Sequence, residues 1–180
     1  LKSPKYFSTT IGSSISSLVN HDEINDINNY RFINGDPLSG SKVEYSKYIG
    51  FYNNCLSIIE EGNNYRMLGW LPFMYNSVPS LSKTSFSWLL GGAKKVNTNL
   101  NGEERAIVVT GEMEKYFPMD IYPMQLIKAC MRGDIEKMES LGIYEVVPED
   151  FGLVDFSCTS KIEAQEIIKS GIEIMLKEVG

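Results

Sequence analysis

The final third of the sequence is divided into helices by a series of start and stop residues. Pro123 suits the first turn of a helix, and Gly133 suits its end. Asp134 is placed to cap a second helix that Gly142 ends, and a capping box at Ser160–Glu163 begins a third. Apolar residues repeat at helical spacing in each: Leu126, Ile127 and Cys130; Ile135, Met138 and Leu141; Ile168, Ile172, Met175 and Val179. This pattern predicts amphipathic helices packed on a shared core.

The first eighty residues have a different character, because they are rich in Ser, Asn, Tyr and Gly with short β-prone runs between turn signals. We expect strands at Tyr6–Ile11 and Tyr30–Ile33, and a pair formed by Tyr52–Ile59 and Tyr65–Leu71 across Glu61–Asn64. Gly12 and Ser13 lead into a short amphipathic helix whose inward residues are Ile15, Leu18 and Val19. Strands around one short helix predict a β-grasp-like domain.

The span from Ser77 to Gly92 is interpreted as a connector, since its Ser and Thr residues compete for backbone hydrogen bonds. Beyond it, Asn101-Gly102 predicts a two-residue hairpin between Val96–Leu100 and Arg105–Val109. The fold class is therefore α+β, with a β-grasp-like domain over residues 1–80 and a helical domain over residues 81–180.

The net charge of −6 excludes one class of partner. Residues 1–90 carry seven basic and seven acidic side chains, whereas residues 91–180 carry ten and sixteen. Such a surface repels phosphate backbones, so we expect no nucleic acid partner. No apolar run approaches the ~20 residues of a membrane-spanning helix. The sequence begins at Leu1 without a signal peptide pattern, and we expect a processed chain or an excised fragment.

Residues able to carry chemistry are few and far apart. Cys55, Cys130 and Cys158 are odd in number and widely spaced, which favours a reducing, cytoplasmic setting over a disulfide framework. His21 is the sole histidine, and without a second one no zinc spacing can be written. The sequence has no G-x-G-x-x-G and no Walker loop. We therefore assign no catalytic, cofactor-binding or metal-binding residue.

Two further features have plain structural interpretations. The acidic pairs Glu60-Glu61, Glu103-Glu104 and Glu149-Asp150 are expected to face water, as neighbouring carboxylates at turns do. The turn Asn34–Gly40 offers backbone N–H groups to a ligand, but its glycines are better explained by turn geometry.

The spacing of a ferredoxin-type cluster site is more informative, although most of its cysteines are missing here. A bacterial ferredoxin-type site uses the spacing C-x2-C-x2-C-x3-C-P, because each cluster iron needs a thiolate. Counted back from Phe117-Pro118 the four positions are Ile107, Thr110, Met113 and Phe117, and counted back from Cys158 they are Pro148, Phe151, Val154 and Cys158. Only Cys158 supplies a sulfur ligand of this kind, which argues against an electron carrier of the ferredoxin class.

The same regions carry a resemblance to a known family, the C-terminal region of the A subunit of the Na+-translocating NADH:quinone oxidoreductase. The similarity spans essentially the whole chain and lies in these runs: Thr9–Gly12, Ile33–Gly40, Gly69-Trp70, Asn101–Val108, Phe117–Pro123, Leu141-Gly142, Pro148–Phe151 and Phe156–Cys158. The chain departs from the family pattern around Ser77–Thr84, where Lys83 stands in place of an expected arginine and lacks its planar fork.

The resemblance implies a peripheral subunit on the cytoplasmic face of the bacterial inner membrane. In relatives such as the cluster-carrying subunit of the Rnf complex, a soluble-ligand-binding β-grasp domain precedes a helical ferredoxin-like domain. It also implies that NADH, flavins and iron-sulfur centres lie on other subunits, and that the membrane-embedded B subunit is the nearest partner. Whether a quinone reaches this chain at that interface stays open.

Two functions remain in competition. The first is a structural and docking part of this sodium pump, with the loops Ile107–Phe117 and Pro148–Cys158 as the regions of interest. The second is a stand-alone small-ligand-binding module that uses the Asn34–Gly40 turn.

Overall fold

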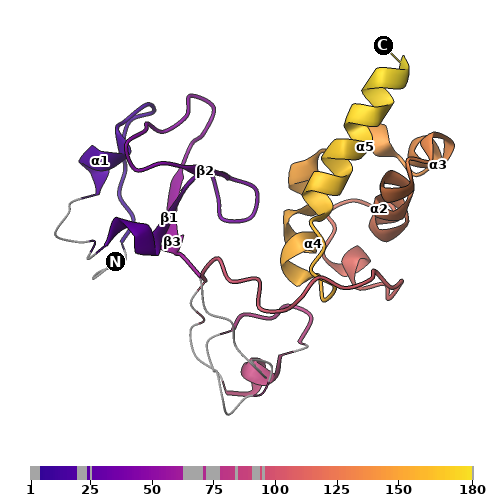
Figure 1. Ribbon diagram of the computed structural model, residues 1–180, viewed down its shortest axis with the longest axis horizontal. Helices are drawn as coiled ribbons and strands as arrows, with labels where there is room; N and C mark the ends of the chain where they lie inside the picture. Colours follow the sequence, from indigo (N-terminus) through magenta and orange to yellow (C-terminus); the bar gives the residue numbers. More distant parts are fainter. Residues whose placement is uncertain are drawn as a thin grey trace. The chain divides into compact units, whose positions relative to one another are not determined.

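The computed structural model describes residues 5–19, 24, 26–62, 71, 78–83, 85–90, 94 and 96–179 (Figure 1). The chain divides into two compact units, residues 1–67 with 94–99 and residues 68–93 with 100–180. We call them the β unit and the helical unit. His21 and most of the predicted strand Tyr65–Leu71 lie outside the described residues. The mixed α+β class predicted from the sequence is confirmed, with a small antiparallel sheet followed by helices.

The β unit is built on a three-stranded antiparallel sheet in the order β2-β1-β3. The central strand β1 (Tyr30–Asn34) pairs with β2 (Ser41–Val43) and β3 (Leu56–Glu60). A one-turn helix, α1 (Ile15–Leu18), follows Gly12 as predicted, and a 3-10 turn, η2 (Ile27–Asn29), leads into β1. The core of the unit contains the buried side chains of Ile15, Val19, Ile24, Phe32 and Ile49.

Two strand predictions in this unit are wrong. Tyr6–Ile11 is not a strand, and the Tyr6 side chain is fully exposed. Thr9 and Thr10 instead bond the Ser13 hydroxyl in a local turn, as short polar side chains tend to do. The strand predicted at Tyr52 begins only at Leu56 and pairs with β1. Phe51 and Tyr52 form a turn before it.

The predicted hairpin at Asn101-Gly102 is also wrong. Asn101 does have a positive φ of 53°, but neither flank is a strand. Asn97 forms an isolated parallel bridge with Glu60 in the β unit, whereas the Arg105 N–H donates to the Ser160 carbonyl in the helical unit at 2.8 Å. Long-range partners therefore replaced the local pairing that the turn residues favour.

The helical unit contains α2 (Pro123–Arg132), α3 (Ile135–Ser140), α4 (Gly152–Ser157) and α5 (Ala164–Val179). Short 3-10 segments are η3 (Phe86–Leu90), η4 (Met113–Lys115), η5 (Ile143–Glu145) and η6 (Pro148–Phe151). The predicted signals at the first two helices are confirmed. Pro123 starts α2, Gly133 ends it with a φ of 68°, and the Asp134 carboxylate accepts from the Lys137 N–H at the start of α3.

The predicted capping box of α5 is wrong, because the helix begins only at Ala164. Ser160 donates its hydroxyl to the Ala106 carbonyl instead. The Asp155 carboxylate at the end of α4 accepts from the backbone N–H groups of Ala164 and Gln165. A side chain from the preceding helix thus supplies the cap that the local sequence was expected to provide.

The core of the helical unit lies between α5 and the helices α2, α3 and α4 that surround it (Figure 1). The predicted stripe on α5 is confirmed at Ile168 and Met175, which are buried, and at Ile172, which packs against the core. The side chain of Val179 lies outside the described part of the chain. Gly171 on the same helix allows a close approach to α2, since a Cβ there would lie 2.5 Å from the Cys130 Sγ. Among the described residues, no helix is both long and apolar enough to span a bilayer.

Candidate docking site

The two loops singled out by the cluster spacing meet in the helical unit. One link between them is a ring contact between Phe117 and Phe151, whose centroids are 4.7 Å apart. Phe151 is fully buried and Phe117 is 8% exposed. The structure therefore joins segments that are more than thirty residues apart in the sequence.

Six of the eight positions where the spacing would require thiolates hold side chains of the core or packed against it. Met113, Phe117, Phe151, Val154 and Cys158 are all buried in one hydrophobic cluster, and Ile107 packs against it. Thr110 is exposed and Pro148 is half-buried. Within the part of the chain that the structure describes, no three His, Cys, Asp or Glu side chains come together as metal ligands. The apolar side chains fill the region and hold the two loops against each other.

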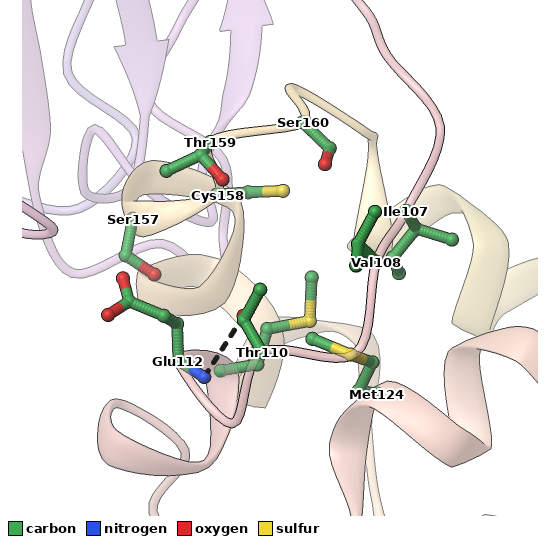
Figure 2. A pocket seen from close by; sticks show the side chains of 10 residues that line it. Ile107, Val108, Thr110, Glu112, Met124, Ser157, Cys158, Thr159 and Ser160 are labelled. Carbon is green, nitrogen blue, oxygen red and sulfur yellow. Dashed lines mark hydrogen bonds between the residues drawn. The ribbon is translucent and has the colours of Figure 1, made fainter. Parts of the chain in front are cut away.

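A small cavity lies beside this cluster, between the chain at 107–112 and the loop 157–160 (Figure 2). Figure 2 shows Ile107 and Val108 on one side and Cys158 and Ser160 on the other. Its volume is about 20 Å³, which is room for about one water molecule. The cavity is therefore too small for an organic cofactor.

The chain that forms one wall of this cavity is attached at its beginning. The Arg105 N–H donates to the Ser160 carbonyl at 2.8 Å, and the Ser160 hydroxyl donates to the Ala106 carbonyl at 3.2 Å. Further along, Val108 and Val109 are 65% and 55% exposed. These valines give the site an apolar outer surface.

The thiols have ordinary structural surroundings. Cys55 is exposed, whereas Cys130 and Cys158 are buried, and all three are free. Burial raises the pKa of the Cys130 thiol to about 11. A thiol that stays protonated is a poor nucleophile, so Cys130 acts as a small apolar side chain in the core.

The Asn34–Gly40 turn uses its own backbone N–H groups. The Asp36 carboxylate accepts from the N–H groups of Leu38 and Ser39 at 2.7 and 3.0 Å, and the Gly40 N–H donates to the Asp36 carbonyl. The Ser39 hydroxyl also donates to Asp36 and lowers the pKa of that carboxyl. Three of the N–H groups that a ligand would need are thus occupied within the turn.

The acidic pairs are only partly as predicted. Glu60, Glu103, Glu104 and Glu149 are exposed. The expectation is wrong for Glu61, which accepts hydrogen bonds from the Arg31 guanidinium and the Thr98 hydroxyl. The bond from Arg31 lowers the pKa of the Glu61 carboxyl. Within the β unit, Glu61 therefore links strand β1, through Arg31, to the segment that contains Thr98.

Comparison with known proteins finds relatives of this chain. A family model described as "NQRA C-terminal domain" matches residues 1–45. The chain is 32% identical over 176 residues, or 97% of its length, to the A subunit of the "Na(+)-translocating NADH-quinone reductase" of Neisseria meningitidis. It is 34% identical over 184 residues to the same subunit from Pasteurella multocida, and 35% identical over 184 residues to the one from Chlamydia pneumoniae.

The chain is homologous to the A subunit, NQRA, of the Na(+)-translocating NADH-quinone reductase. The resemblance inferred from the sequence is thus confirmed. The chain spans 38 to 40% of the length of these curated relatives.

The place where the sequence departs from the NQRA pattern has a simple structure. Lys83 has a positive φ of 56°, and its Nζ lies 5.7 Å from the centre of the Trp88 ring. A cation over an indole face is a stabilising arrangement. Lys83 therefore has a structural role within the described part of the helical unit.

A second hollow, on the β unit, was missed in the sequence. Its volume is about 280 Å³, and its walls include Tyr30, Phe32, Val43 and Tyr45, with Lys42 and Glu44 beside them. The Phe32 and Tyr45 rings are 5.5 Å apart at their centroids. The alternation of Tyr30 with Phe32 on β1 was the available signal, since alternate residues of a strand share one face.

Proposed function

We propose that this chain is a structural and docking part of the NQRA subunit of a Na+-translocating NADH-quinone reductase, with no redox centre of its own. The homology supports the assignment to NQRA. The main support for a docking role comes from the core of the helical unit. There, apolar side chains of the two loops pack at positions where the cluster spacing would require thiolates. In this proposal a ferredoxin-like frame is kept without its cluster ligands, and association with a partner is its use.

The proposal extends to the assembly. NADH, flavins and iron-sulfur centres lie on other subunits, and the membrane-embedded B subunit is the nearest partner, with a quinone held at their interface. The chain then works peripherally at the cytoplasmic face of the bacterial inner membrane. In this proposal the β unit is a β-grasp-like domain and the helical unit a ferredoxin-like domain without clusters. Catalysis belongs to the whole complex.

The test uses the complete NQRA protein in its complex. Deletion of residues 100–180, which removes most of the helical unit, is expected to abolish co-purification with the membrane subunits and NADH-dependent quinone reduction together. Circular dichroism of the truncated protein checks that the remainder folds. A matched control carries Leu176→Ala, an exposed position on α5, and is expected to assemble normally. Normal assembly and activity of the deletion variant would refute the proposal.

A second candidate is a stand-alone small-ligand-binding module, which the hollow on the β unit favours. Apolar walls with a few polar groups are typical of small-molecule sites. The test is native mass spectrometry of the chain purified from its source. A co-purifying small molecule that is lost in Tyr45→Ala, but kept in the exposed control Tyr48→Ala, would support this candidate.

A further inference from the structure

One segment of the helical unit has the composition of a strand but pairs with no strand among the described residues. Residues Ala106-Ile107-Val108-Val109-Thr110 are mostly β-branched, and they adopt neither helix nor turn. Ile107 packs against the core, whereas Val108 and Val109 are exposed. Such residues favour a pleated, half-buried surface. The segment therefore has an inner side whose apolar side chain is packed on the core and an outer side whose apolar side chains are exposed.

The backbone of this segment is likewise open. The two bonds to Ser160 involve Arg105 and Ala106 at its beginning. From Ile107 to Val109, the described residues provide no hydrogen-bond partner for the main-chain N–H or C=O groups. Exposed apolar chain with unpaired backbone groups is a template for strand pairing, and folded proteins usually cover or charge such an edge.

The surrounding charges indicate what covers it. Glu103 and Glu104 precede the segment, and Glu112 and Glu114 follow it, against Arg105 and Lys115. Lys115 is engaged with Glu112 at 3.1 Å. At the first end the Lys161 side chain also lies against Gly102, beside Glu103. The second end, with Glu112 and Glu114 against Lys115, is net acidic, which favours a partner with Lys or Arg side chains at the matching positions.

The same charges disfavour a second copy of this chain. Antiparallel self-pairing centred between Ile107 and Val108 would put Glu103 of one copy opposite Glu112 of the other. Parallel self-pairing in register would set each glutamate beside its own copy. Like charges directly opposite each other destabilise a strand pair.

We propose that residues 106–110 dock an extended, basic segment of another subunit by strand addition. Main-chain hydrogen bonds to residues 107–109 supply the affinity, and Val108 and Val109 meet apolar side chains of the incoming strand. This inference rests on the proposed function, because it specifies how the docking part holds its partner.

The experiment compares amide hydrogen exchange in the isolated complete NQRA protein and in the assembled reductase. The amides of residues 107–109 are expected to exchange rapidly in the isolated protein and about tenfold or more slowly in the complex. Two variants accompany the measurement. Val108→Pro removes an N–H that strand addition needs, whereas Val108→Thr keeps both the N–H and the branched side chain.

The expected result is that Val108→Pro lowers the yield of assembled complex at least about tenfold while Val108→Thr does not, since only proline blocks the ladder. Both variants should leave the melting temperature of the 180-residue chain within about 2 °C of the parent, because Val108 is exposed. Three results would overturn the inference. These are fast exchange in an assembled complex, protection already present in the isolated protein, and concentration-dependent self-association of the chain that Val108→Pro abolishes. Failure of the proposed function is distinguishable, because then the deletion variant assembles normally.

Discussion

The helical unit and the β unit bury apolar side chains to different depths. In the helical unit, Phe151, Leu126, Ile127, Met138 and Ile168 are fully buried in one cluster to which every α-helix of the unit contributes. The core of the β unit draws on α1, on β1 and on residues from intervening loops. A cluster built on regular helices loses more when one member is removed, because its neighbours are held by their own backbone bonds and relax less.

The second difference lies in the carboxylate that links separate segments within each unit. In the helical unit, the half-buried carboxylate of Asp155 accepts hydrogen bonds at the start of α5, whereas in the β unit Glu61 pairs with the partly exposed Arg31. Burial penalises the charged form of the first, and a cation stabilises the charged form of the second. The contributions of these two carboxylates to stability should therefore respond to acid in opposite directions.

The largest expected effect is the loss of a core ring. Phe151→Ala removes a fully buried side chain and its contact with Phe117, and should lower the free energy of unfolding of the helical unit by about 3–5 kcal/mol. Guanidinium unfolding followed by circular dichroism at the helical band measures it. Leu153→Ala, at a 45% exposed position on α4, is the control and should cost far less. Equal costs for the two variants would contradict the description of the core.

The second prediction concerns the close approach of α5 and α2. Gly171→Ala places a methyl group 2.5 Å from the Cys130 Sγ and should cost about 1–3 kcal/mol in spite of the better helix propensity of alanine. In the double variant with Cys130→Ala the obstructing sulfur is gone, so part of the loss should be recovered. Purely additive costs in the same unfolding assay would show that the helices are not in contact there.

The third prediction concerns the cap of α5. Asp155→Ala should cost about 1 kcal/mol at neutral pH, because two backbone N–H groups lose their acceptor. Burial raises the pKa of the Asp155 carboxyl, although the Gln165 side chain and the backbone bonds lower it. The folded chain therefore holds this proton to higher pH than the unfolded chain, and its contribution to stability falls as the pH rises through the folded pKa.

Asp155→Asn tests that sign, since it keeps a carbonyl oxygen for the Ala164 N–H and has no titrating proton. The stability of this variant relative to the parent should increase as the pH is raised from the acid side to neutrality. A relative stability that does not change with pH would contradict the assigned direction of the shift.

The smallest effect is expected in the β unit. The Arg31 hydrogen bond lowers the pKa of the Glu61 carboxyl, so its contribution to stability is present above the unfolded pKa and is lost as the pH falls through the folded one. Solvent screens the pair, whose Arg31 side chain is 35% exposed, and Glu61→Gln should cost less than about 1 kcal/mol. The loss of stability is measured by amide hydrogen exchange of β1, and Glu60→Gln, at an exposed position, is the control. A pH response of the same sign as that of Asp155 would remove the contrast between the units.

Local sequence was enough to predict the features that a single turn of chain can specify. Pro123, Gly133 and Asp134 act within three or four residues, because a fixed φ, a left-handed φ and a side-chain cap are local properties. The stripe of Ile168 and Met175 was equally readable, since helical periodicity reports which face is buried. For the candidate site, the spacing of a ferredoxin-type motif indicated the two loops, although all but one of its cysteines are absent.

The features that depend on distant partners could be seen only in the folded molecule. Asp155, rather than Ser160, caps α5, and β3 lies against β1. Asn101-Gly102 has the residues of a hairpin, yet its flanks bond to Glu60 on one side and to Ser160 on the other. In each case a local preference of about 1 kcal/mol was outweighed by backbone hydrogen bonds and apolar burial that the chain gains only when remote segments meet.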